Sequence, residues 1–386
     1  MKIVDVRAFA LAAPRKENLS GHLPYEDHLK GIARAGYYAT FVKITTHGGI
    51  TGWGESICRE VPQAAAAIIE TLFKPVLLGQ DPLDIEVLWE RLFHTLRTRG
   101  HSEGFFVEAI SGVDCALWDI AGKHFQVPVH RLIGGAHEDK VKAYASSILM
   151  QKPEEVVKTA QRLIAQGHDQ IKIKVGRGDL DVESVKGIRD ACGYSVGIMV
   201  DANSAYNAAT AIKWGRKFEK YECMWLEEPV PPDDINGYVK VAKALDIPIC
   251  GSESLFGRYN FRDLIVSGAV DIVQPDVARV GGISEIKKIT AIASAFNMPI
   301  TLHVGLSGAG CRAAALQVAP TLPRELFLNY EIYFLPNPLH TDILNTPIEK
   351  FSNGYLELPK DPGLSLSINE DTLRKFSMHP YSHSEI

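Results

Sequence analysis

The sequence has few of the features that mark secreted, membrane or nucleic-acid-binding proteins. Its 386 residues include six isolated cysteines and no CxxC pair. A disulfide framework or a cysteine-based zinc site is therefore not expected, and scattered cysteines fit a reducing compartment. The 41 basic and 46 acidic residues give a net charge of −5, and no basic stripe is visible. This balance argues against nucleic acid or an anionic membrane as a partner.

Long hydrophobic runs are also missing, and none approaches the length of a membrane span. The opening MKIVDVRAFALAAPRKE is briefly apolar, but Asp5 and Arg7 interrupt it, and its alternation fits a strand better than a signal peptide. The hydrophobic fraction of 46% and the charged fraction of 23% are those of a globular chain. We therefore expect a soluble, cytoplasmic protein with a sizeable core and two domains.

The first 130 residues predict an α+β domain. Strand patterns come first and helical patterns follow, without alternation between them. We expect a strand over 2–12, a hairpin over 37–56 that turns at His-Gly-Gly, and helices over 63–78, 83–97 and 106–124.

The chain then changes to a regular strand–helix alternation, which is typical of a parallel barrel. Helical patterns such as 153–166 and 284–296 separate the strands. We assign the barrel to residues 131–350 and expect the final segment, 351–386, to return to the N-terminal domain. The predicted barrel strands lie near 141–147, 170–175, 197–202, 223–227, 247–253, 271–275, 299–303 and 326–331.

Polar side chains recur where these strands end, about 23 to 28 residues apart, which is the length of one strand–helix unit. A parallel barrel brings the carboxyl ends of its strands to one face, and polar residues there are typical of catalysis. In chain order the residues are Lys172 and Lys174, Asp201, Glu227, Glu253, Asp276, His303 and Glu331.

Asp201, Glu227 and Glu253 follow successive strands, and three converging carboxylates repel one another unless a cation lies between them. Oxygen ligands without cysteine or histidine select a hard cation, and Mg²⁺ keeps open positions for substrate oxygens. Glu228 is adjacent to Glu227 and is an alternative ligand. Because strand side chains alternate, only one of the two should reach the metal.

Lys172 and Lys174 flank one residue and therefore point to the same side of their strand. If that side is the barrel interior, mutual repulsion and desolvation should lower the pKa of a lysine so that it can act as a base. His303 can exchange protons near neutral pH, and Asp276 on the preceding strand can fix its tautomer by a hydrogen bond.

This set suits removal of the proton alpha to a carboxylate. A divalent cation on the carboxylate oxygens neutralises the enediolate, and bases on either face move protons.

The chain resembles the enolase superfamily, and within it the mandelate racemase subgroup, over essentially its whole length. The motifs that carry the resemblance are GITGWGES, ALWDIAGKHFQVPVHRLIGG, IKIK, VDANSAY, WLEEP, GSES, QPDVARVGGIS, TLHVG and NYE. The resemblance implies a modified (β/α)₇β barrel with a capping domain built from both termini.

The resemblance also implies roles. It makes Asp201, Glu227 and Glu253 the ligands of one Mg²⁺ per active site. It makes Lys174 the base on one face and the Asp276–His303 dyad the acid/base on the other. Lys172 and Asn203 would lie near the substrate carboxylate, and Glu331 would hydrogen-bond one of its oxygens. Ser252 stands where many relatives carry another small residue, often glycine.

The retained dyad argues against relatives that place a lysine on the later strand. We expect a lyase that acts as an acid-sugar dehydratase and forms a 2-keto-3-deoxy acid, in carbohydrate acid catabolism. A 2-hydroxy-acid racemase is the alternative, and a non-catalytic barrel that binds a small acid or a protein partner is a remote one. We also expect a homo-oligomer.

Substrate specificity should lie in the loops 23–31 and 98–104. Tyr25, His28 and Arg99 in these loops could contact substrate hydroxyls or a distal carboxylate. The alternative is that these residues are solvated loop tips.

Overall fold

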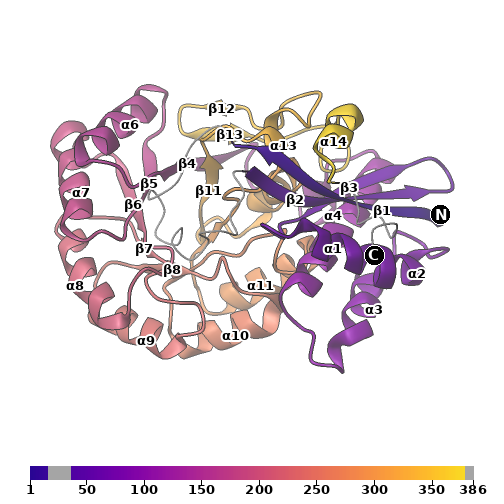
Figure 1. Cartoon of the computed structure of the whole chain (residues 1–386), viewed down its shortest axis with the longest axis horizontal. Coiled ribbons are helices and arrows are strands. Elements are labelled where there is room, and N and C mark those ends of the chain that lie inside the picture. Colours follow the sequence, from indigo (N-terminus) through magenta and orange to yellow (C-terminus); the bar gives the residue numbers. More distant parts are fainter. Residues whose placement is uncertain (16–35, 379–386) are drawn as a thin grey trace, which may run out of the picture.

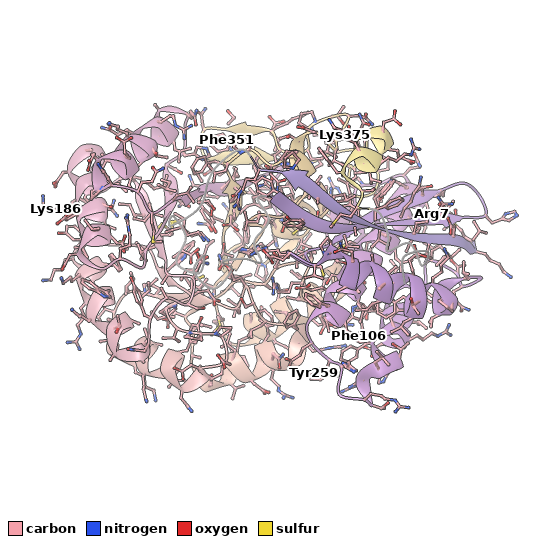
Figure 2. All side chains as sticks on the ribbon, in the orientation of Figure 1. Arg7, Phe106, Lys186, Tyr259, Phe351 and Lys375 are labelled. Carbon is pink, nitrogen blue, oxygen red and sulfur yellow. The ribbon has the colours of Figure 1, made fainter. Side chains whose placement is uncertain are left out.

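The computed structural model of the chain describes residues 1–15 and 36–378. Figure 1 shows a barrel of alternating strands and helices beside a mixed α+β unit that contains the N-terminus. Lys186 on the barrel side and Arg7 on the other side lie toward opposite ends of the molecule (Figure 2).

The α+β unit begins with an antiparallel sheet. Strands β1 (Ile3–Pro14), β2 (Gly36–Thr46) and β3 (Thr51–Ser56) pair in that order. The N–H of Gly49 donates to the carbonyl of Thr46 at 2.9 Å where the chain turns between β2 and β3. The sheet confirms the predicted opening strand and hairpin.

The first predicted helix, 63–78, is helical as far as Leu77 but is not uniform. Its middle turn is π-helical, and the N–H of Lys74 bonds to the carbonyl of Ile69, five residues back. Pro75 has no N–H to donate and therefore disturbs the regular hydrogen bonding at this point. The three pieces are α1 (Pro62–Ile68), the π-turn η2 (Ile69–Phe73) and α2 (Lys74–Leu77).

Helices α3 (Ile85–Arg97) and α4 (Phe105–Phe125) complete this unit and match the predicted helices. Helix α4 packs directly on β3, where a Cβ atom at Gly54 would lie 2.1 Å from the carbonyl oxygen of Gly112. Glycine at this position of the GWGES motif therefore lets the helix touch the sheet.

Eight parallel strands form the barrel, which closes because β11 pairs with β4. The strands are β4 (Lys140–Ile148), β5 (Gln170–Lys174), β6 (Gly197–Asp201), β7 (Leu226–Glu227), β8 (Ile249–Gly251), β9 (Ile272–Val273), β10 (Ile300–Leu302) and β11 (Phe327–Tyr333). The connecting helices are α6 (Pro153–Ala165), α7 (Asp179–Cys192), α8 (Ala208–Glu219), α9 (Ile235–Ala244), α10 (Gly257–Ser267), α11 (Ile283–Ala295) and α12 (Ala309–Val318). The predicted (β/α)₇β barrel is confirmed. Among the helices that the structure describes, none is long and apolar enough to cross a membrane.

The C-terminal segment meets both parts of the molecule. Strand β13 pairs antiparallel with the start of β4, so the segment first extends the barrel. It then reaches the α+β unit, where the N–H of Met378 donates to the carbonyl of Ala10 at 2.8 Å. The domain boundaries at about 130 and 350 stay a prediction. The remaining elements are α5 (Val129–Leu132), the 3₁₀ turn η3 (Ala319–Thr321), α13 (Pro338–Thr341), β12 (Phe351–Ser352), β13 (Tyr355–Glu357) and α14 (Glu370–Phe376).

The barrel interior changes character along its strands. A buried apolar cluster lies on one level and consists of Tyr144, Met199, Trp225, Cys250 and Ile272. Side chains two positions apart on a strand point to the same side, so the next interior level is reached two residues later. On β6 and β7 that level is Asp201 and Glu227, both fully buried. The candidate site therefore sits directly above an apolar layer.

Candidate active site

Three carboxylates meet where β6, β7 and β8 end. Asp201 and Glu227 are the last residues of β6 and β7, and Glu253 follows β8 closely. One carboxylate oxygen from each lies within 4.8 Å of the other two. Asp201 and Glu227 are buried, whereas the Glu253 side chain is 13% exposed. This all-oxygen set, with one member open to a cavity, fits a hard divalent cation that also contacts a substrate.

Neighbouring donors fix the orientation of Glu227. Its Oε2 accepts from the indole N–H of Trp225 at 2.9 Å and from the amide of Gln274 at 3.2 Å. Burial raises the pKa of Glu227 to about 8, with Lys172 opposing the rise and Asp201 adding to it. Carboxylates that disfavour each other's charge in this way favour a cation between them.

Glu228 is not part of this set, which agrees with the prediction that only one of the two adjacent glutamates reaches it. Its Oε1 accepts from the N–H of Ser252 at 2.7 Å. Ser252 has a φ of +92°, in the region that glycine adopts most easily. Its hydroxyl accepts from the N–H of Gln274 at 3.0 Å, which helps to hold that conformation.

Lys172 lies inside the barrel, and its Nζ contacts Glu227, Glu331 at 3.1 Å and Asp201 at 3.7 Å. Burial opposes its charge, but Glu227 and Glu331 raise the pKa of Lys172 well above its usual value. The expectation that repulsion lowers a lysine pKa is therefore wrong for Lys172, because surrounding carboxylates outweigh the second ammonium group.

Lys174 points to the same side of β5 as Lys172 but lies nearer to the cavity. Its Nζ contacts Oδ2 of Asp201 at 2.5 Å, and its side chain is 11% exposed. An ammonium group at this point lies beside the proposed metal ligands and lines the cavity. The ammonium form of Lys174 could give a proton there, and the neutral amine could take one.

The predicted hydrogen bond between His303 and Asp276 is present. The Nδ1 of His303 lies 2.6 Å from Oδ2 of Asp276, and Nε2 lies 3.2 Å from Glu253. Burial lowers the pKa of His303, but the charges of Glu253 and Glu331 and the bond to Asp276 raise it overall. This arrangement leaves Nε2 as the nitrogen on the Glu253 side for proton transfer.

Glu331 is held as an anion. Burial alone would raise its pKa, but Lys172 and His303 lower the pKa of Glu331 well below its usual range. Its Oε2 accepts from the N–H groups of Val304 at 2.8 Å and Gly305 at 3.0 Å. A carboxylate accepts and does not donate, so a hydrogen bond to a substrate carboxylate oxygen would require Glu331 to take up a proton.

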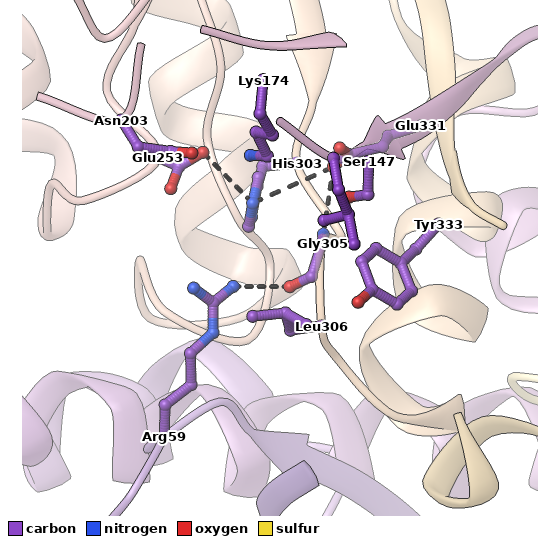
Figure 3. Close-up of a pocket in the computed structure, with 11 residues that line it drawn as sticks. Arg59, Ser147, Lys174, Asn203, Glu253, His303, Gly305, Leu306, Glu331 and Tyr333 are labelled. Atoms are coloured by element: carbon purple, nitrogen blue, oxygen red, sulfur yellow. Dashed lines mark hydrogen bonds and ion pairs between the residues drawn. The ribbon is translucent and has the colours of Figure 1, made fainter. Parts of the chain in front are cut away.

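One cavity joins these groups, and Figure 3 shows its lining. Lys174, Asn203, Glu253, His303 and Glu331 line it as expected at the barrel mouth. Sequence reasoning missed the remaining lining residues, which are Arg59, Ser147, Leu149, Gly305, Leu306 and Tyr333.

Of the three predicted cap residues, the structure describes only Arg99. Tyr25 and His28 lie outside the described residues. Arg99 is exposed and is not among the residues that line the cavity. Arg59 instead reaches the cavity from the segment after β3 and donates to the carbonyl of Gly305 (Figure 3).

Unusual backbone conformations gather around the cavity. Six non-glycine residues at or shortly after the ends of barrel strands have positive φ angles, in the region that such residues rarely adopt. Conformations of this kind cluster at functional sites. The residues are Ser147, Asn203, Ser204, Glu228, Ser252 and Leu306.

Comparison with known families agrees with this geometry. The family described as Enolase C-terminal domain-like matches residues 155–372. The family described as Mandelate racemase / muconate lactonizing enzyme, N-terminal domain, matches residues 22–134. Together these two matches include the barrel from α6 onward and most of the α+β unit.

Individual relatives match nearly the whole chain. D-galactarolactone cycloisomerase of Agrobacterium fabrum is 35% identical, over 87% of this chain and 90% of that protein. Arabinonate dehydratase of Saccharolobus solfataricus is 33% identical, over 90% of this chain and 93% of that protein. The structure of a racemase from Streptomyces coelicolor with bound magnesium has a TM-score of 0.87 and 27% identity, covering 97% and 100% of the two chains. The chain is therefore an enzyme of the mandelate racemase/muconate lactonizing enzyme family, within the enolase superfamily.

Proposed function

We propose that the protein is a Mg²⁺-dependent acid-sugar dehydratase. It removes the proton alpha to the carboxylate of a polyhydroxy acid and expels the beta hydroxyl, and the enol product becomes a 2-keto-3-deoxy acid. The observation that carries the proposal is that Lys174 and the Asp276-bound His303 line one cavity beside the carboxylate triad. The arabinonate dehydratase relative supports the substrate class.

Asp201, Glu227 and Glu253 would hold the metal, because their oxygens are close enough to share one cation. When bound, Mg²⁺ neutralises charge on the substrate carboxylate oxygens. Asn203, whose side-chain Oδ1 is buried without a hydrogen-bond partner in the described structure, lies where it can contact the same end of the substrate.

Proton transfer then falls to two groups. One of Lys174 and His303 takes the alpha proton, and substrate stereochemistry decides which. His303 can also deliver a proton to the departing hydroxyl, because Asp276 stabilises its charged form. Water leaves with the hydroxyl oxygen and that proton, so the step needs no oxidant or reductant.

Two other outcomes follow from the same first step. Reprotonation from the opposite face would make the enzyme a 2-hydroxy-acid racemase. Expulsion of a ring oxygen in place of a hydroxyl would make it a cycloisomerase, a candidate favoured by the 35% identity to D-galactarolactone cycloisomerase.

A sugar-acid screen tests the proposal. Parent protein with Mg²⁺ is incubated with aldonic and aldaric acids and their lactones, and 2-keto acids are detected with semicarbazide. Each positive acid is then followed by NMR in D₂O. A 2-keto-3-deoxy product supports dehydration. An inverted alpha carbon with all hydroxyls retained indicates a racemase, and consumption of only a lactone indicates a cycloisomerase. If Lys174→Ala and His303→Asn both turn over these acids at the parent rate, neither residue is the catalytic base.

A further inference from the structure

A short segment that begins at the end of β3, residues 55–59, contacts both barrel loops that carry the Asp276–His303 dyad. Glu55 accepts from the N–H of Gly308 at 2.7 Å and from that of Cys311 at 2.9 Å. Ile57 donates its N–H to the carbonyl of Ala278 at 3.2 Å. One strand end of the α+β unit is thus tied to the loops after β9 and β10.

Glu55 fits tightly into its position. It is fully buried, and a Cβ atom added at Gly310 would lie 2.6 Å from the Cβ of Glu55. Its carboxylate meets the first turn of α12, which begins at Ala309, where helix N–H groups lack intrahelical partners. The Glu55 side chain therefore packs closely against the first turn of α12, at the end of the loop that begins at His303.

The same helix turn touches the dyad. The thiol of Cys311, the residue whose N–H bonds to Glu55, lies 3.5 Å from Oδ1 of Asp276. That oxygen also accepts from the N–H of Ala278 at 2.8 Å, and Ala278 is the residue that Ile57 contacts. Both routes from the 55–59 segment therefore end on the oxygen of Asp276 that does not face His303.

We propose that Glu55 is a positioning residue for the acid/base dyad, through which the α+β unit sets the orientation of Asp276 and His303. It does not touch the substrate. It holds Gly308 and Cys311 in place, and this contact fixes the loop after His303 and the donor behind Asp276. The inference rests on the proposed function only in so far as His303 moves protons in catalysis.

A second buried carboxylate provides a matched control. Asp114 of α4 accepts from the N–H of Ser284 at 3.0 Å and from its hydroxyl at 2.5 Å, at the first turn of α11. It makes the same kind of contact between the two units, but it does not bond to the loop that follows His303. Glu55→Gln and Asp114→Asn should therefore cost similar stability while differing in their effect on the dyad.

The first measurement requires no substrate. The proton between His303 and Asp276 is sought as a downfield imidazole resonance, assigned by its loss in His303→Asn. We expect Glu55→Gln to shift or broaden this resonance and Asp114→Asn to leave it unchanged. An unchanged resonance in Glu55→Gln, or the same change in both variants, would overturn the inference whatever reaction the enzyme catalyses.

The second measurement uses a turned-over sugar acid. We expect Glu55→Gln to lower kcat by roughly 10- to 100-fold, as for other residues that orient a catalytic group, with little change in KM. Its pattern of alpha-proton exchange in D₂O should resemble that of His303→Asn and not that of Lys174→Ala. A pattern that resembles Lys174→Ala would contradict the inference. If Glu55→Gln does not fold, Cys311→Ala serves in both measurements, because it removes the thiol that contacts Oδ1 of Asp276. If the parent protein turns over no sugar acid, that result counts against the proposed function. The resonance measurement then decides the inference about Glu55 by itself.

Discussion

Two levels of the barrel interior, two residues apart at β6 and at β7, have different roles. On β6, Met199 belongs to the apolar cluster and Asp201 to the carboxylate triad. Next to β7, Trp225 packs in the same cluster, and Glu227 is the triad member two residues later. The lower level buries apolar surface, and the upper level gathers charges whose pKa values are displaced. Residues that stabilise the fold and residues of the candidate site thus lie only two positions apart in the chain.

The largest effect on activity is expected from a substitution in the upper level. Glu227→Gln should lower activity by more than the roughly 100-fold typical of losing a residue that only orients a metal ligand. The fold should persist, because the amide is close in shape and Lys172 keeps Glu331 and Asp201 as partners. Turnover, Mg²⁺ binding by calorimetry and thermal melting are measured together. Full activity of the parent protein in excess chelator would contradict the metal assignment.

Asp276→Asn should lower dehydration by about 10²- to 10⁴-fold, the usual contribution of acid–base catalysis. The imidazole of His303 would lose the carboxylate that holds its tautomer and stabilises its charge. Metal affinity should not change, since Asp276 is outside the triad. Steady-state kinetics and calorimetry on the same sample separate these effects, and weaker metal binding would show that the two groups are not independent.

Substitutions in the lower level should mainly lower the free energy of unfolding. Met199→Ala leaves a cavity in a fully buried apolar cluster and should cost about 2–5 kcal/mol of unfolding free energy. Activity per folded molecule should change little. Met199→Leu nearly conserves volume and should cost less than about 1.5 kcal/mol. Urea unfolding and active-site titration give the two quantities, and a large loss of kcat at unchanged stability would contradict the separation.

Trp225→Phe sharpens the comparison, because this residue belongs to the lower level and donates to Glu227 at 2.9 Å. Loss of the donor should weaken metal binding by roughly 10- to 100-fold. Most of the aromatic packing should be retained. The apparent Mg²⁺ affinity is the quantity to measure, and an unchanged affinity would mean that Gln274 alone orients the ligand.

The smallest effect on turnover is expected from a buried carboxylate outside the barrel interior. Burial raises the pKa of Asp114 to about 7, although Ser284 donates to it. The folded state therefore holds its proton more tightly than the unfolded state does. The stability from this group is complete below the unfolded pKa near 3.8 and is lost as pH rises through about 7. Asp114→Asn should flatten the stability profile over this window by at most about 1.4 kcal/mol per pH unit. Urea unfolding between pH 4.5 and 8 tests this, and an unchanged slope would contradict it.

The barrel strands and the charged groups at their ends were predictable from the sequence. Alternation shows which side chains share a face, and a spacing of one strand–helix unit indicates that the strand ends meet. This is why Lys174, Asp201 and His303 could be assigned to one mouth of the barrel from their positions in the chain. The same period predicted that only one of Glu227 and Glu228 would reach the metal, and the family resemblance indicated Glu227.

Other features depend on contacts that local patterns do not contain. Arg59 reaches Gly305, which is 246 residues away, and Glu55 reaches Gly308 across 253 residues. The raised pKa of Lys172 depends on how many carboxylates surround it, which the spacing of two lysines does not reveal. Left-handed backbone at Ser252 is also hidden, because serine rarely adopts it without tertiary support.

The close contact between Glu55 and Gly310 also limits how chimeras of such enzymes can be built. A Cβ atom at position 310 would collide with Glu55, so any other residue there requires a different partner at position 55. Exchange of the first 130 residues for those of a relative would therefore succeed only if the donor carries a side chain of matching reach at position 55. Chimeras built across this junction would have to transfer the two positions together.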